Sequence, residues 1–394
     1  MKYICELIMG QSPNNETVNY DEEGLPFLQG KADFGQVSPT PTVWCSEPKK
    51  VASKGDVLLS VRAPVGTVNL CNQDYAIGRG LCAIRAKKIT KRFCWYLSQD
   101  ITDELCSYAV GTTYDSVTIS DIANLMISYP SIMEQEYITQ YLDNHISRID
   151  TALTDLKMQA EMLDAYKKEL IANAITQGLE KAVPMKDSGV DWIGEVPEHW
   201  NITKMKWMFE IVKRIYGEED RDVLSITQRG IKIKDTDSND GQLAESYANY
   251  QVVNVNDFAM NSMDLLTGWV DCSPYEGVTS PDYRVFRFLP SKPQCQNYYK
   301  HMFQMFYKRR IFYRLGQGVS NLGRWRLQAD QFLNMYLPQP PLEEQKQIAE
   351  YLDAKTAEIE NLIADINTQV EKLKQYRKII IHDAVSGKIK MEGA

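Results

Sequence analysis

One long segment occurs twice in the chain, and this repeat constrains the fold more than any other feature of the sequence. A shift of 210 positions places Gln345 on Gln135, Leu352 on Leu142 and Tyr376 on Tyr166. The register holds without a gap between residues 341–387 and residues 131–177. An alignment of this length indicates an internal repeat, so both copies are predicted to have the same structure.

Each copy has the apolar pattern of a long helix. The seam of the first copy consists of Leu142, Ile146, Ile149, Leu153, Leu156, Ala160, Leu163, Leu170 and Ala174, and that of the second consists of Leu352, Ile359, Ile363, Ile366, Val370, Leu373, Ile380 and Ala384. Lys167 and Arg377 fill the one polar slot of each seam. The seam recurs about every 3.5 residues, which is typical of a coiled coil. At about 1.5 Å per residue each helix would be roughly 50–60 Å long.

Neither helix can bury such a seam alone. The nearest partner for each copy is the other copy, so the repeat predicts two long helices packed on each other. The alternative is that two unrelated amphipathic helices each lie on their own domain.

Length and composition favour a soluble, intracellular protein. The 394 residues suffice for two or more domains, and no run of eighteen apolar residues predicts a membrane span. The first residues, MKYICELIMG, carry Glu6 within a short apolar run and do not resemble a signal peptide. The eight cysteines include no C-x-x-C pair, and the four histidines are far apart. We therefore expect free thiols in a reducing cytoplasm and no metal site.

The net charge of −8 is unevenly distributed. No acidic residue lies between Asp282 and Asp330, an interval that holds ten lysines and arginines, and a smaller basic interval lies between Asp74 and Asp100. Local basic surface, rather than bulk charge, attracts phosphate groups. The sequence therefore allows a nucleic-acid partner despite its acidic composition.

The chain divides into five parts. Residues 1–129 are predicted to form short strands and turns, among them strands in GDVLLSVRAPVGTV and GLCAIRA, with helical spacing over 91–109 and a strand-like end before Pro130. Residues 130–180 are the first long helix, 181–200 a linker, 201–338 a second globular domain, and 339–394 the second long helix. The globular parts repeat faintly. Met205 aligns with Met1, residues 257–270 with 56–68, Arg287 with Arg85, and Tyr298 with Tyr96.

No catalytic motif is complete. GQGVSNLG lacks the spacing of a dinucleotide loop, and LQGKA has Ala32 where a phosphate loop needs Ser or Thr. The Asn/Asp-Pro-Pro-aromatic tetrapeptide of amino-methyltransferases is also missing, because Leu342 follows Pro340 and Pro341. The sequence therefore predicts a non-catalytic protein. The rival interpretation is an enzyme, such as a nuclease, fused to recognition modules.

Over nearly its whole length the chain resembles the DNA-specificity subunits of type I restriction–modification systems. The most specific segments are PLEEQKQIAEYLD with the heptad helix and AVSGKI after it, WIGEVPEHW, GQSPNN with GLPFLQGKADFG, and GDVLLSVRAPVGT. The resemblance implies an α+β fold in which two similar mixed α/β target recognition domains are separated by an antiparallel coiled coil of the two helices. Each domain would read one half of a split, asymmetric site on double-stranded DNA. Two modification subunits would dock on the helices and carry S-adenosylmethionine, with the restriction and translocase subunits joining through them, and this chain itself would hold no cofactor.

One departure from the family pattern concerns the first residues. Met1 corresponds to Met205, so the WIGEVPEHW lead of the second half has no counterpart at the front. Either the native start is short or the first domain lacks one entry strand. The implied spacing of roughly 50 Å between domains suits half-sites separated by a little more than one DNA turn of about 34–36 Å. Changing the helix length should then change the gap between half-sites.

The candidate DNA-reading residues are polar or basic side chains in glycine-containing turns. Arginine and lysine read guanine, and asparagine and glutamine read adenine. The candidates are Gln29, Lys31, Arg62, Arg79, Thr112, Thr113 and Tyr114 in the first domain, and Gln228, Arg229, Lys232, Lys234, Asn261, Asn321 and Arg324 in the second. For each of them the alternative is a surface charge or a turn cap without DNA contact. Arg284 and Arg287 are assigned to phosphate contact or to the fold, and the aromatic residues of 298–313 to the core rather than to base stacking.

Two further interpretations stay open. One is a coiled-coil scaffold with no DNA role, against which the basic intervals weigh. The other keeps the fold but places the chain in a related anti-phage methylation system with a similar subunit.

Overall fold

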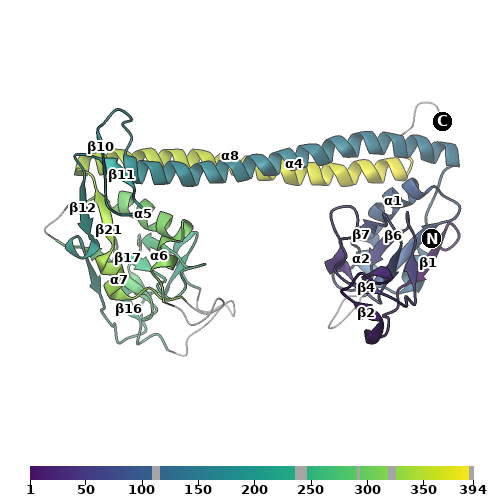
Figure 1. Ribbon diagram of the computed structural model, residues 1–394, viewed down its shortest axis with the longest axis horizontal. Coiled ribbons are helices and arrows are strands. Elements are labelled where there is room, and N and C mark those ends of the chain that lie inside the picture. Colours follow the sequence, from purple (N-terminus) through teal and green to yellow (C-terminus); the bar gives the residue numbers. More distant parts are fainter. Residues whose placement is uncertain (109–115, 236–245, 291–292, 318–324, 390–394) are drawn as a thin grey trace. The chain divides into compact units, whose positions relative to one another are not determined.

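The computed structural model of the chain describes residues 1–108, 116–235, 246–290, 293–317 and 325–389. It divides into two compact units, Met1–Lys157 with Asn367–Ala394 and Met158–Ile366. The boundary cuts the two long helices, α4 (Ile132–Gln177) and α8 (Leu342–Val385), so each unit holds one end of both (Figure 1).

The two long helices pack against each other within each unit, as the repeat predicted. In the second unit Lys167 Nζ lies 3.3 Å from Glu360 Oε1, and in the first unit Arg377 Nε lies 2.9 Å from Asp150 Oδ1. The shift of 210 residues converts one ion pair into the other. The last turn of α4 and the first turns of α8 line one pocket of the second unit, so the helices are antiparallel. The alternative of two unrelated amphipathic helices is therefore wrong.

The predicted seam is the buried side of both helices. Leu142 and Leu352 have no exposed surface, and Ile146, Ile149, Ile359, Val370 and Ile380 are buried as well. Lys167, the polar residue in the seam of α4, is 8% exposed and reaches the Glu360 carboxylate. Placing a lysine in a seam is compatible with the fold because its charge finds a partner at the edge of the packed surface.

In the first unit two sheets pack with three short helices. The antiparallel sheet has the order β1-β9-β6-β7, and the mixed sheet β2-β4-β3-β8-β5 contains one parallel pair, β3 with β8. The strands are β1 (Cys5–Met9), β2 (Val18–Asn19), β3 (Leu25–Leu28), β4 (Trp44–Cys45), β5 (Val51–Ala52), β6 (Val57–Ser60), β7 (Val68–Leu70), β8 (Tyr75–Ile77) and β9 (Leu81–Ala86). The helices are α1 (Lys91–Asp100), α2 (Thr102–Tyr108) and α3 (Ile119–Asn124), with 3-10 turns at Asn15–Thr17 and Lys31–Asp33.

The second unit repeats the main sheet and the three short helices. In place of the five-stranded sheet it has two strand pairs, β14 with β15 and β16 with β19, and it adds two further pairs. Its main sheet, β13-β20-β17-β18, has the strand order of β1-β9-β6-β7. The added pairs are β10 with β11 and β12 with β21. The strands are β10 (Met185–Asp187), β11 (Glu195–Pro197), β12 (Asn201–Lys204), β13 (Phe209–Val212), β14 (Leu224–Thr227), β15 (Gly230–Ile233), β16 (Gln251–Val253), β17 (Phe258–Met260), β18 (Val270–Cys272), β19 (Gly277–Thr279), β20 (Arg284–Phe288) and β21 (Tyr336–Gln339). The helices are α5 (Gln296–Lys308), α6 (Ile311–Arg314) and α7 (Ala329–Asn334), with a 3-10 turn at Met205–Trp207.

The faint repeat of the globular parts is therefore a repeat of structure. Arg85 lies opposite Glu6 in the first sheet and Arg287 opposite Glu210 in the second, which confirms that Arg85 and Arg287 are equivalent. The predicted equivalence of Tyr96 and Tyr298 is wrong. Counting from the helix N-caps, Thr90 and Cys295, Tyr96 corresponds to His301. The sequence alignment missed this shift because the loops before the two helices differ in length.

The aromatic residues of 298–313 belong mainly to the core, as predicted. Tyr298, Tyr299, Phe303, Phe306 and Phe312 have no exposed surface, and Phe303 forms edge contacts with Phe209, Phe258 and Phe286. Burial leaves these rings unable to stack on a DNA base without unfolding the domain. Aromatic pairs of this kind add stability beyond their buried area.

The strand expected before Pro130 does not form. Residues 126–129 have no strand partner among the described residues, whereas β21, which occupies the same place in the second unit, pairs with β12. The residues have apolar character suited to a strand, but a strand needs a neighbour to receive its backbone hydrogen bonds.

Candidate nucleic-acid interface

The first unit brings four of its candidate residues together on neighbouring loops. The loop after β3 carries Gln29 and Lys31, and the loop after β8 carries Arg79. Gly78 N donates to Leu28 O at 2.8 Å, and Val61 N, next to Arg62, donates to Gly80 O at 3.0 Å. The side chains of Gln29, Lys31, Arg62 and Arg79 are all exposed. We call this set the first-unit cluster.

The backbone beneath this cluster is tightly packed. A side chain at Gly80 would place its Cβ 2.6 Å from the Gln29 carbonyl oxygen, so only glycine fits there. Asp33 Oδ2 accepts hydrogen bonds from Gln29 N at 2.6 Å and from Gly30 N at 3.1 Å. Arg79 therefore projects from a fixed loop, which favours recognition because little order is lost on binding.

No other described residue neutralises the charges of the first-unit cluster. Among the described residues no carboxylate forms an ion pair with Lys31, Arg62 or Arg79, whereas Arg85 pairs with Asp56 at 2.8 Å and Arg92 with Asp143 at 2.5 Å. The basic interval of the sequence thus contains two kinds of residue. Arg85 and Arg92 hold the fold, whereas Arg79 is exposed and pairs with no carboxylate among the described residues. An exposed guanidinium has the donors to bind a phosphate or a guanine edge.

In the second unit Gln228 and Arg229 form the turn between β14 and β15. Thr227 Oγ1 accepts from Arg229 N at 3.1 Å, and Gln228 Nε2 donates to Thr267 O at 3.2 Å. Lys232 is exposed on β15, and Lys234 is half-buried just beyond it. The turn presents the Arg229 side chain to solvent.

The side-chain oxygen of Asn261 is already hydrogen-bonded within the protein. Its Oδ1 accepts hydrogen bonds from Met263 N at 3.2 Å and from Asp264 N at 3.3 Å, which caps a turn. Reading adenine would require this oxygen to accept from the base instead. Five further candidates, namely Thr112, Thr113, Tyr114, Asn321 and Arg324, lie outside the described residues.

The large basic interval of the second unit is mostly structural. Arg284 is 8% exposed, donates from Nη2 to Leu327 O at 2.7 Å and lies over the Phe332 ring, and burial lowers its pKa to about 10. Arg287 pairs with Glu210 at 2.8 Å and Arg309 with Glu169 at 2.7 Å. Arg284 therefore serves the fold, which was one of its two predicted roles.

Arg326 is a candidate that the sequence did not single out. It is exposed, and the next residue, Leu327, donates its backbone N–H to Ser262 O at 3.1 Å. The equivalent hydrogen bond of the first unit runs from Val117 N to Val61 O. Arg326 therefore corresponds to Ser116 of the first unit, and Ser116 pairs with Arg62. The only signal in the sequence was membership of a basic interval, which did not distinguish Arg326 from its paired neighbours.

Chemistry other than recognition has little support in the described part of the chain. There, no three His, Cys, Asp or Glu side chains lie close enough to hold a metal ion. The eight cysteines are free, and burial raises the pKa of the Cys82 thiol to about 12. None of the described helices has the length and apolar character to cross a membrane.

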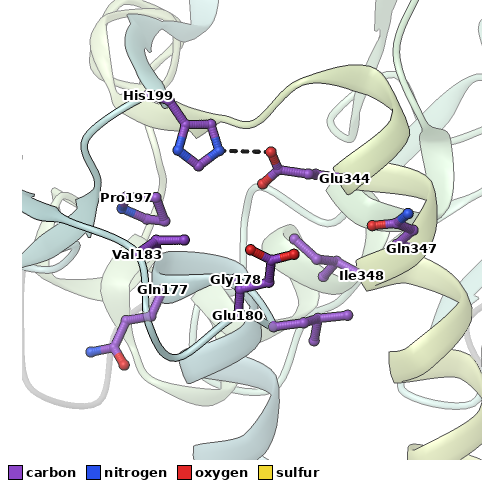
Figure 2. Close-up of a pocket in the computed structure, with 10 residues that line it drawn as sticks. Gln177, Gly178, Glu180, Val183, Pro197, His199, Glu344, Gln347 and Ile348 are labelled. Atoms are coloured by element: carbon purple, nitrogen blue, oxygen red, sulfur yellow. Dashed lines mark hydrogen bonds and ion pairs between the residues drawn. The ribbon is translucent and has the colours of Figure 1, made fainter.

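A pocket of about 100 Å³ in the second unit is lined by residues of the linker and of the first turns of α8 (Figure 2). His199 Nε2 lies 2.7 Å from Glu344 Oε1, and Trp200 Nε1 donates to Glu344 Oε2 at 2.8 Å. Both oxygens of the carboxylate are engaged, so Glu344 anchors the linker to the helix.

Comparison with known proteins agrees with this architecture. The model of the type I restriction modification DNA specificity domain matches residues 1–162 and 197–372. A protein of Methanocaldococcus jannaschii assigned as the MjaX specificity subunit is 34% identical over 177 residues, which cover 44% of this chain and 40% of that protein. The EcoBI specificity subunit of Escherichia coli is 20% identical over 415 residues, covering 96% of this chain and 76% of that one.

The fold has a solved counterpart. A chain from a study of complex assembly and conformational transition of the type I R-M system superimposes with a TM-score of 0.72 at 15% identity, covering 98% of this chain and 97% of that chain. This similarity confirms the predicted α+β fold. Specificity subunits are the non-catalytic members of type I systems, in line with the missing catalytic motifs. The chain belongs to the family of type I restriction–modification DNA specificity subunits.

Proposed function

We propose that the chain reads a bipartite, asymmetric sequence on double-stranded DNA and carries the modification subunits of a type I system to it. Residues 1–129 and 201–338 would be the two target recognition domains, and residues 130–180 and 339–394 the helices that connect them, with 181–200 as the linker. S-adenosylmethionine would be held by the modification subunits, and the restriction and translocase subunits would join through them in the cytoplasm.

The observation that carries DNA reading is the first-unit cluster. Its three basic side chains and Gln29 project from fixed loops, and no ion pair among the described residues neutralises them. Phosphate contact needs available positive charge, and base reading needs side chains held in one place. The cluster meets both requirements.

The asymmetry of the proposed target follows from the differences between the two units. Arg79 follows β8 by two residues, and at the same distance after β19 the second unit has Pro281. Proline has no donor to offer a base edge, whereas arginine binds guanine with two hydrogen bonds. Two surfaces with different donors would select two different half-sites.

Docking of partner subunits is supported by apolar side chains on the outer faces of the helices. Tyr166 of α4 is 58% exposed, and Tyr376, its equivalent in α8, is 50% exposed. Met158 and Met162 continue the exposed face of α4 toward the middle of the helix. Because the tyrosine position repeats, the same kind of partner surface would bind once to each unit, which gives two modification subunits.

Methylome sequencing tests this function. Cells that carry the chain with its neighbouring modification subunit would be compared with cells that lack this chain alone. We expect adenine methylation at a split, asymmetric motif that disappears with the chain. Unchanged methylation, with the complex expressed and assembled, would contradict the proposal and favour a scaffold without a DNA role.

A further inference from the structure

Two thiols of the first unit lie next to each other in its core. Cys5 begins β1 and Cys94 lies in α1, and their sulfur atoms are 3.9 Å apart. Both side chains are buried, with 3% and 1% of their surface exposed. All eight cysteines lie in the described part of the chain, and no other two of them are hydrogen-bonded to each other. The fold therefore brings two thiols 89 positions apart in sequence to within about 2 Å of the length of a disulfide bond.

The second unit has a different pair of side chains at the same place. The strand registers of the two main sheets align Phe209 with Cys5. Counted from the N-caps of the two domain helices, Tyr299 aligns with Cys94. The rings of Phe209 and Tyr299 are in edge contact, with centroids 5.5 Å apart. Packing of the first strand on the domain helix therefore does not require sulfur, and of the two units only the first has a pair there that can form a covalent bond.

The two thiols differ in acidity. The Cys94 S–H donates to the Cys5 sulfur, and this hydrogen bond lowers the pKa of the Cys5 thiol, against the effect of burial. The same hydrogen bond, together with burial, raises the pKa of the Cys94 thiol. Because a thiolate is the nucleophile in thiol oxidation, Cys5 is suited to attack an oxidant and Cys94 to form the bond afterwards.

The two thiols belong to elements that lie between a reading loop and a long helix. The chain continues from β1 to Gly10, whose N–H donates to Leu81 O at 2.9 Å, beside the loop that carries Arg79. The helix α1 is held to the start of α4 by the hydrogen bond from Thr90 N to Gln135 Oε1 at 2.8 Å. A covalent bond from β1 to α1 would therefore tie the strand next to the Arg79 loop to the helix that attaches the domain to α4.

From these observations we infer that Cys5 and Cys94 are a site of reversible oxidation, where hydrogen peroxide converts the two thiols to a disulfide that locks β1 to α1. The Cys5 thiolate attacks one peroxide oxygen, the O–O bond breaks, and the departing hydroxide takes up the proton that the Cys5 thiol released. The Cys94 sulfur then attacks the sulfur of the Cys5 sulfenic acid, the S–O bond breaks, and the second hydroxide leaves as water with the Cys94 proton. The peroxide gains two electrons and each sulfur loses one.

Peptide mapping of the unmodified full chain tests the site. The reduced chain is treated with hydrogen peroxide at neutral pH, and the remaining thiols are then alkylated in denaturant. We expect a disulfide between Cys5 and Cys94 that dithiothreitol removes, with a yield at least about tenfold above that of any other pair. The inference is wrong if both thiols are still alkylated when the exposed Cys106 is fully oxidised, or if they are linked to other cysteines.

Two serine variants separate the roles of the sulfur atoms. Cys94→Ser keeps a donor for the Cys5 sulfur but cannot form a disulfide, so a sulfenic acid should accumulate on Cys5. Dimedone labelling of Cys5 after peroxide treatment should rise at least about tenfold over that of the unmodified chain. The control Cys106→Ser removes an exposed thiol and should leave the yield of the Cys5–Cys94 disulfide within about twofold. Absence of dimedone on Cys5 in a folded Cys94→Ser chain would contradict the proposed order of attack.

Urea unfolding tests what the bond does to the first unit. A link between residues 5 and 94 restricts the unfolded chain, so oxidation should raise the urea midpoint of the first unit by about 1 M and leave that of the second unit unchanged. The rise should disappear on reduction and be absent from Cys94→Ser. An unchanged or lower midpoint in the chain that carries the disulfide would refute the lock. The site does not depend on DNA reading, so either proposal can fail without the other.

Discussion

The two units hold their globular domains to the long helices with the same side chain, but they differ in a neighbouring contact and in the candidate reading loops. Gln135 Oε1 accepts from Thr90 N at 2.8 Å while its Nε2 donates to Pro130 O at 2.9 Å. Gln345 does the same with Cys295 N at 3.0 Å and Pro340 O at 2.8 Å. Both glutamines are fully buried, and each fastens the start of a domain helix to the start of a long helix.

About two helical turns further along, the same position of each long helix has different partners. Asp143 accepts hydrogen bonds from Arg92 at 2.7 Å and from the Tyr96 hydroxyl at 2.5 Å. Asp353 binds His301 at 2.7 Å and Asn297 at 3.0 Å. The attachment thus tolerates substitution of the donors as long as a carboxylate accepts from the first turns of the domain helix. The candidate reading loops differ more strongly still, so a common frame supports two different surfaces.

Loss of the glutamine contact should have the largest effect on stability. Gln135→Ala leaves the Thr90 N–H and the Pro130 carbonyl without partners in a buried place, which should cost about 2–3 kcal/mol. Gln345→Ala should cost the same within about 1 kcal/mol, because the geometry is the same. Urea unfolding of the full chain, fitted as two transitions for the two units, measures both. A large loss in only one unit would break the equivalence.

Removal of Arg79 should affect DNA binding and leave stability unchanged. Arg79→Ala removes an exposed guanidinium that forms no ion pair with the described carboxylates, and it should weaken binding to the methylated motif by about 1–3 kcal/mol. The matched control is Arg287→Ala, an arginine that is half exposed but paired with Glu210, and its effect on affinity should be small. Fluorescence anisotropy at two salt concentrations checks this prediction. If both variants lose affinity equally, availability of charge does not distinguish reading residues from structural ones.

Reversal of the interhelical ion pairs should have a smaller effect. Lys167→Glu places a second carboxylate beside Glu360 and should destabilise the second unit by about 1 kcal/mol. Adding Glu360→Lys should restore stability to within about 0.5 kcal/mol. Arg377→Glu should cost more than Lys167→Glu, since Arg377 also donates to Gln99 Oε1 at 2.9 Å. Thermal unfolding of the single and double variants measures these differences, and failure of the double variant to recover would show that the pairs do not contribute through their charges.

The smallest effect should come from the acid side of the pH profile. The hydrogen bond from His301 lowers the pKa of Asp353 below its ordinary value of 3.8. A lowered carboxyl pKa stabilises the folded state at pH above 3.8, and this contribution disappears as the pH falls through the folded-state pKa. Asp353→Asn should therefore reduce the loss of stability of the second unit below about pH 4, by less than about 1 kcal/mol because the group is partly exposed. If the urea midpoint of the second unit falls equally below about pH 4 with and without Asp353→Asn, this prediction is wrong.

The repeat by itself determined the frame of this protein. An apolar seam that no single helix can bury required a partner, and the second copy of the seam supplied it, so packing of α4 on α8 followed from the positions of Leu142, Leu352 and their neighbours. Strand segments such as GLCAIRA were also correctly predicted, because local residue preference and tertiary contacts agree there.

Only the tertiary structure decided which polar side chains are available for function. Arg79 and Arg85 lie six positions apart in one basic interval, but of the two only Arg85 forms an ion pair with a described carboxylate, that of Asp56. The same reason explains why residues 126–129 form no strand: they resemble β21, but no strand in the described part of the chain pairs with them. Pairing depends on which distant segments meet, and a single sequence records the partners of a side chain or a strand only where a repeat makes them visible.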